Sequence, residues 1–267
     1  MRWFAKAWAS VLKDARIDAS YRVAFVLEAF DGLLMLVAYG FLAGLFGGRV
    51  LDGYAPLGFL LVGVAANSAL TTALVYFAQA VRGVQAAGAI KILLTTPTPP
   101  LEIVVLSSIY PFLRAGVDLV VWLSAAALLG APLVGLTAGG VVATGVVFVT
   151  AAVAMAGFGF LAAAFAIVFK RGDPIVWILG AANMLLSGVL YPTSSLPTAL
   201  ATVGQWLPAT HALNAMRDVL LGGESLVGVW PELLTLAAFG AVGIPLGLGA
   251  LLFAIRYARQ EGTVGHV

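Results

Sequence analysis

Long apolar stretches separated by short polar connections make up most of the chain. Six of them come close to the ~20 residues with which an α-helix crosses a hydrocarbon core. They lie at residues 23–46, 55–81, 102–129, 136–168, 174–190 and 231–255. The pattern predicts an all-α membrane protein with six transmembrane helices, in a single domain that covers residues 1–267.

Residues 1–22 precede the first span and show a different pattern. Apolar side chains recur there at helical spacing, and basic side chains fall mainly on the other side. The apolar set is Phe4, Trp8, Val11, Leu12 and Ala15, and the basic set is Arg2, Lys6, Lys13 and Arg16. We expect an amphipathic helix at the membrane interface, with its rings at the acyl boundary and its bases near lipid headgroups. A solvated tail is the alternative.

The connection at residues 191–230 is the longest one between two spans. It is moderately apolar, but it contains charged residues and is interrupted at Pro197 and Pro208. A seventh span there would bring charged side chains into the bilayer, at a cost of roughly 2.5–3.5 kcal/mol each. We therefore predict an external hairpin of two short helices, at 196–206 and 210–221, that enters the outer leaflet or rests on it.

The basic residues divide unequally between the two sides of this topology. With both termini inside, eleven of the 14 Lys and Arg residues lie on the cytoplasmic side and Arg114 lies within a span. The cytoplasmic set is Arg2, Lys6, Lys13, Arg16, Arg22, Arg82, Lys91, Lys170, Arg171, Arg256 and Arg259, and the outer set is Arg49 and Arg217. This bias supports cytoplasmic termini and an even number of spans.

Composition agrees with the membrane class and excludes others. Apolar residues are 62% and charged residues 10% of the 267 positions, and the mean hydropathy is +1.05, whereas soluble domains are about a quarter charged. A net charge of +2 provides no strong field for nucleic acid. The richness in Ala, Gly and Val favours a bacterial source, so we expect the cytoplasmic (inner) membrane as the location.

Motifs of several chemistries are absent from the sequence. There is no cysteine, the only histidines are His211 and His266, and neither a G-x-x-x-x-G-K-[ST] loop nor a G-x-S-x-G turn occurs. We therefore expect no catalytic site, no metal site and no ATP site on this chain. No residue is identified as a substrate ligand.

Arg114 and Asp118 are four residues apart on the third predicted span, so they share one helix face. One interpretation is mutual neutralisation, which lets the helix insert into the bilayer. The other is a polar lining of a transport path.

Glycines recur within the fourth and sixth predicted spans. We interpret them as points of close packing between helices, and a glycine hinge is the alternative. The examples are Gly157, Gly159, Gly243, Gly247 and Gly249.

The connection between the second and third spans reads GVQAAGAIKILLTTPTPPLEIVVLSSI over residues 83–109. A short amphipathic helix is predicted at 88–97, opened by a glycine and stopped by prolines. Its residues are Gly88, Ala89, Ile90, Lys91, Leu93, Leu94, Thr95, Thr96 and Pro97, of which Ile90, Leu93 and Leu94, together with Ala89, form the apolar face. Such a helix is expected to insert into a groove on a partner. The alternative is an interfacial helix on the inner leaflet.

Two segments resemble the permeases of type-2 ABC exporters. The segment at 88–97 is similar to their coupling helix, and residues 187–223, SGVLYPTSSLPTALATVGQWLPATHALNAMRDVLLGG, are similar to the signature that follows their fifth span. The elements of this signature in the external hairpin are Tyr191, Pro192, Leu196, Pro197, Pro208, His211 and Arg217. We expect His211 and Arg217 to cap or anchor the hairpin.

The resemblance implies a permease, in a homodimer or pseudo-dimer, in which each copy docks through 88–97 on a separate ATP-binding-cassette ATPase that holds ATP and Mg. It also implies outward movement of a drug, a lipid or a glycan-type substrate. The sequence departs from the family pattern at Ala89, Ile90 and Lys91, where many members carry an acidic residue, so we expect the mode of ATPase docking or the choice of partner to differ. An ion- or proton-coupled secondary transporter is the runner-up, although no repeated halves are visible.

Overall fold

The computed structural model describes residues 2–20, 22–86, 100–169 and 174–260. Within these ranges the chain forms helices and turns and no β-strand. The helices are α1 (Arg2–Ser20), α2 (Arg22–Leu45), α3 (Pro56–Ala86), α5 (Pro100–Leu128), α6 (Ala138–Phe169), α7 (Pro174–Leu186), the 3-10 helix η1 (Thr193–Ser195), α8 (Thr198–Gly204), α9 (Pro208–Leu220) and α10 (Trp230–Gln260). The predicted helix at 88–97 lies outside the described residues.

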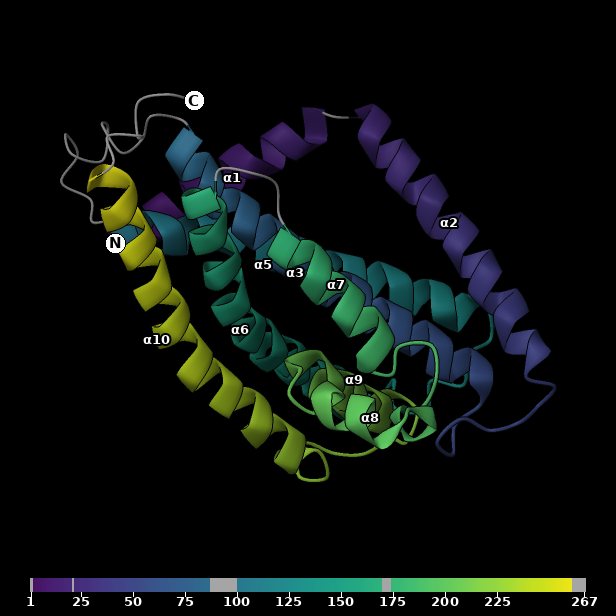
Figure 1. The fold of residues 1–267 in the computed structure, drawn as a ribbon. Helices are drawn as coiled ribbons and strands as arrows, with labels where there is room; N and C mark the ends of the chain where they lie inside the picture. Colours follow the sequence, from purple (N-terminus) through teal and green to yellow (C-terminus); the bar gives the residue numbers. More distant parts are fainter. Residues whose placement is uncertain (1, 21, 87–99, 170–173, 261–267) are drawn as a thin grey trace.

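In Figure 1 the long helices α3, α5, α6 and α10 form a bundle, α2 runs at an angle away from it, and the short helices α8 and α9 lie at one end. Helix α6 packs on α10 and α3, and α3 packs on α5. In Figure 1, α1 and the last turns of α10 lie at one end of the molecule, and α8 and α9 lie at the other. This arrangement is the one that a topology with both termini on one side and the hairpin on the other requires.

Four helices in the described part of the chain are long and apolar enough to cross a membrane. They contain the spans Pro56–Val75, Ile109–Leu128, Ala138–Phe169 and Trp230–Ala254. Two shorter apolar helical segments, Leu34–Leu45 and Val176–Leu186, belong to α2 and α7. Four of the six predicted spans therefore meet the length criterion, and the total of six stays a prediction.

Helix α7 is shorter than the span predicted at 174–190. It ends at Leu186, because Ser187 is followed by Gly188 in a left-handed conformation with φ of +75° that an ordinary helix cannot continue through. Its 13 residues reach about 20 Å at 1.5 Å per residue, less than the roughly 30 Å of a hydrocarbon core.

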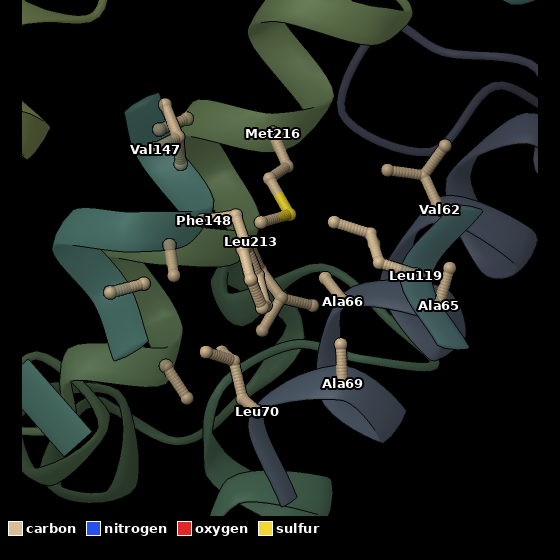
Figure 2. Packing of buried hydrophobic residues seen from close by; sticks show 14 of the residues in the cluster. Val62, Ala65, Ala66, Ala69, Leu70, Leu119, Val147, Phe148, Leu213 and Met216 are labelled. Carbon is tan, nitrogen blue, oxygen red and sulfur yellow. The ribbon is translucent and has the colours of Figure 1, made fainter. Parts of the chain in front are cut away.

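The two short helices of the hairpin lie close to their predicted positions, and α9 is buried within the bundle, which the sequence did not predict. Ten of its residues are buried, among them Leu213, Met216 and Arg217. Figure 2 shows Leu213 and Met216 between α3 and α6, beside Leu70 and Val147. A helix of this length is too short to be a seventh span, and it forms part of the core of the bundle.

Small residues allow α6 and α10 to pack closely. A Cβ atom added to Gly157 would lie 2.8 Å from Cα of Gly243, and one added to Gly247 would lie 2.5 Å from the carbonyl oxygen of Gly157. The predicted close packing is thus confirmed at these three glycines. At Gly249 an added Cβ meets no described atom within 4 Å, so the interpretation of this glycine stays a prediction.

Helix α1 exposes the aromatic part of its predicted apolar face. Phe4 and Trp8 are 76% and 69% exposed, and α1 also packs against α5. Exposed rings of this size are typical of side chains that meet lipid at the membrane boundary.

Candidate functional site

The buried guanidinium of Arg217 joins three segments at the end of the bundle where α8 and α9 lie (Figure 1). Arg217 lies on α9 and is 4% exposed. Its Nη2 atom donates to the carbonyl oxygens of Gly188 at 2.8 Å, Val189 at 3.0 Å and Phe59 at 3.2 Å. The ring of Phe59 lies below the guanidinium, 3.5 Å from its Cζ atom to the ring centroid. A cation that is removed from water is stabilised here by carbonyl dipoles and a π face.

Gly63 provides the space that this arrangement requires. A Cβ atom at position 63 would lie 2.4 Å from Nη2 of Arg217 and 2.5 Å from the carbonyl oxygen of Val189. Both distances are far below van der Waals contact, so an alanine would displace the guanidinium, the backbone of Val189, or both. No local pattern identifies this glycine, because its partners lie more than 100 residues further along the chain.

A second polar contact lies beside the first. The hydroxyl of Tyr54 donates to Oδ1 of Asp218 at 2.8 Å. Burial, followed by the hydrogen bond to Asp218, raises the pKa of Tyr54 to about 12, so the phenol stays protonated and remains a donor at neutral pH. Burial lowers the pKa of Arg217 to about 9, against the opposing effect of Asp52 and Asp218, and the guanidinium is therefore still charged at pH 7.

The junction between α8 and α9 has its own anchors. Thr210 Oγ1 donates to the carbonyl oxygen of Gly204 at 2.6 Å, and His211 Nε2 lies 3.0 Å from that of Gln205. Leu207 is extended, with φ of −97° and ψ of 123°, as expected for a residue before Pro208. His211 and Pro208 thus help to fix the first turn of α9 against the end of α8.

The remaining signature residues shape the chain between α7 and α8. The hydroxyl of Tyr191 donates to the carbonyl oxygen of Leu185, so it ties the turn back to α7. Pro192 is buried and precedes η1, and Leu196 is extended before Pro197, which precedes α8. The structure therefore gathers the predicted signature residues at one end of the bundle.

Arg114 and Asp118 are also brought together, with a third charged group that the sequence did not reveal. Arg114 Nε lies 3.2 Å from Oδ1 of Asp118, and its Nη1 lies 3.4 Å from Oδ2 of Asp18 on α1. The hydroxyl of Tyr110 donates to Oδ2 of Asp18 at 2.6 Å. These groups connect α1 with α5. Asp18 was hidden by its place in a charged N-terminal segment, where nothing in the spacing distinguishes it from Asp14.

We expect loss of one charged partner to be worse than loss of both. Arg114→Leu and Asp118→Leu should each reduce the yield of folded protein, by less than the roughly 3–5 kcal/mol of a fully buried pair, since the side chains are 21% and 24% exposed. The double variant should recover part of the yield. Adding Asp18→Asn should recover more, because Asp18 otherwise loses Arg114. Size-exclusion profiles in detergent measure this, and wild-type yields from both single variants would contradict it.

Within the described residues no group of three His, Cys, Asp or Glu side chains is close enough to hold a metal ion. The predicted docking residues at 88–97 lie outside those residues, so their arrangement stays a prediction. The part of the site that the structure describes is therefore the end of the bundle that contains α8 and α9, together with the α1–α5 contact.

Comparisons with known proteins agree with the pattern of helices. The family model for the ABC-2 type transporter membrane domain matches residues 4–221. A segment of 44 residues is 48% identical to ABC transporter G family member 20 of Dictyostelium discoideum. That segment is 16% of this chain and 6% of the relative, so the chain matches only a small part of that protein.

Proposed function

This chain belongs to the ABC-2 type transporter family, and we propose that it is the permease subunit of an ATP-driven exporter whose ATPase is a separate polypeptide. The family match carries the proposal, because residues 4–221 include both the predicted docking segment and most of the external signature. A membrane subunit of an ABC transporter provides the path, and ATP binding and hydrolysis on the ATPase change its shape. The proposed cargo is a drug, a lipid or a glycan-type molecule that moves outward.

The proposed assembly contains two permease copies, each docked on an ATP-binding-cassette ATPase through residues 88–97. The ATPase binds ATP and Mg. Both termini face the cytoplasm of a bacterial cell and the hairpin at 191–230 faces outward. This orientation is supported by the excess of Lys and Arg on the predicted cytoplasmic side. It is also supported by the position of α8 and α9 at the end of the molecule opposite to α1 and the last turns of α10.

Membrane lipids are proposed partners of α1. Its exposed Phe4 and Trp8 would enter the inner leaflet, and Lys6 and Lys13, of which Lys13 has a 64% exposed side chain, would face the headgroups. In this position α1 rests on the membrane while the contact from Asp18 to Arg114 holds it against α5.

A screen of ATP hydrolysis tests the proposal and narrows the cargo. The chain is purified together with its ATPase and reconstituted in liposomes, and candidate drugs, lipids and glycolipids are added one class at a time. We expect one class to stimulate hydrolysis, because cargo binding favours the conformations through which the cycle proceeds. If no class of compound changes the rate of ATP hydrolysis, and the complex exports none of the compounds, the result contradicts an exporter.

A further inference from the structure

The contacts of Arg217 belong to a larger set at the outer end of the bundle. Its three carbonyl partners come from α3 and from the turn directly after α7. The contact between Tyr54 and Asp218 joins the segment before α3 to α9 as well. A third contact, 3.4 Å from Ser194 Oγ to Oδ1 of Asp52, joins that segment to η1. The same three parts of the chain are therefore joined at three successive places.

The guanidinium is shielded from cargo in this arrangement. It is 4% exposed, and the ring of Phe59 covers one side of it. Its Nη2 atom donates hydrogen bonds to backbone carbonyl oxygens. Charge-assisted hydrogen bonds of this kind are stronger than neutral ones. Backbone carbonyls also hold the position of whole segments, which a contact between two side-chain tips does not. Arg217 is thus placed to fix geometry rather than to bind a transported molecule.

We propose that Arg217 is a positioning residue that fastens the outer ends of α3, α7 and α9 into one unit, which stays closed throughout the transport cycle. The inference rests on the proposed exporter function. It adds that the cargo exit does not open between α3 and α9, and that these ends move together when the transporter changes conformation. Gly63 is the second component of the unit, because it leaves the space that the guanidinium and Val189 occupy.

A disulfide across the unit provides the first test. A Cβ atom on Gly58 of α3 would lie 2.9 Å from Cδ2 of Leu221, at the end of α9, so positions 58 and 221 are neighbours across the unit and are the sites chosen for a pair of cysteines. The chain has no cysteine of its own, so Gly58→Cys/Leu221→Cys carries the only pair. The measurement is ATP hydrolysis by the permease–ATPase complex in liposomes, in preparations whose crosslink is shown by a gel shift, before and after reduction with dithiothreitol.

We expect the oxidised and reduced complexes to hydrolyse MgATP at rates within about twofold of each other, because a unit that never opens is not hindered by a bond across it. A rate that falls tenfold or so on oxidation and returns on reduction would overturn the inference, because it would show that α3 and α9 must separate. If the cysteine-free parent complex also lacks hydrolysis, the proposed function fails, and this inference fails with it.

The second test asks whether Arg217 holds the unit together. In membranes, the rate of disulfide formation between positions 58 and 221 is compared in Arg217→Gln, Arg217→Lys and Gly63→Ala backgrounds. We expect Arg217→Gln and Gly63→Ala to slow disulfide formation by about tenfold. Arg217→Lys should slow it by less, because its ammonium group keeps the charge but not the planar arrangement of donors. Gly145→Ala is the matched control, because its added Cβ meets no atom within 4 Å. Unchanged rates in both Arg217→Gln and Gly63→Ala would refute the role of Arg217.

Discussion

Leu93→Glu and Leu94→Glu permeases are expected to insert normally into the membrane and to lose their ATPase. The change would place an unpaired carboxylate on the apolar face of the helix predicted at 88–97. Burying such a group against a partner costs about 3–5 kcal/mol, which is more than a hundredfold in affinity. The predicted spans are untouched, so the amount of permease in the membrane should stay near that of the wild type.

Co-purification of the ATPase with tagged permease measures this effect. Lys91→Ala is the matched control in the same segment. Lys91 lies on the flank of the predicted face, and rim charges contribute little once salt screens them. This variant should therefore retain the ATPase at low salt and lose some of it at high salt. If Leu93→Glu and Leu94→Glu retain the ATPase fully and still export, the segment at 88–97 is only a surface helix.

The second large effect is expected at the contact between α6 and α10. In Gly157→Ala, the added Cβ would lie 2.5 Å from the carbonyl carbon of Gly243. The obstructing atom belongs to the backbone, so the two helices must move apart, and overpacking of this kind costs about 1–3 kcal/mol. In a bilayer the loss is important because close packing, rather than the hydrophobic effect, holds helices together.

Gly145→Ala on the same helix is the control for Gly157→Ala. Its Cβ meets open space, and alanine favours a helix over glycine by roughly 0.5–1 kcal/mol. Fluorescence-detected size-exclusion chromatography after heating should show a lower midpoint for Gly157→Ala and an unchanged or higher midpoint for Gly145→Ala. Equal midpoints for the two variants would mean that the glycine contact does not stabilise the bundle.

The glycines of α6 and α10 show which contacts can be predicted from sequence patterns and which cannot. Gly243 and Gly247 are four residues apart and share one face of α10, and both contact α6 near Gly157. Gly249 is two residues further, so it lies about 200° around the helix from Gly247 and faces away. The helical period of 3.6 residues places Gly249 on a different face from Gly243 and Gly247, so it distinguishes the glycine without a contact from the two that contact α6. The presence of a glycine in an apolar span does not make this distinction. The partner helix itself, α6, could not be derived from spacing alone.

The hairpin at 191–230 shows that contacts between distant parts of the chain cannot be predicted from local sequence patterns. Prolines and polar residues predict two short helices between residues 191 and 230, and the structure has α8 and α9 there. The depth of α9 was not predictable, because its burial depends on Leu70 of α3 and Val147 of α6. The carbonyl partners of Arg217 are 28, 29 and 158 residues away in the chain. Local composition cannot indicate contacts at such distances.

If this chain forms a transport path driven by a separate ATPase, export requires both proteins. ATP hydrolysis and export are measured in one set of liposomes that contain the permease alone, the ATPase alone, both, or the ATPase with the Leu93→Glu permease. We expect ATP-driven export only where the ATPase and wild-type permease are combined. Cargo movement by the permease alone in response to a proton gradient, without ATP or ATPase, would contradict the proposed function and indicate a secondary transporter.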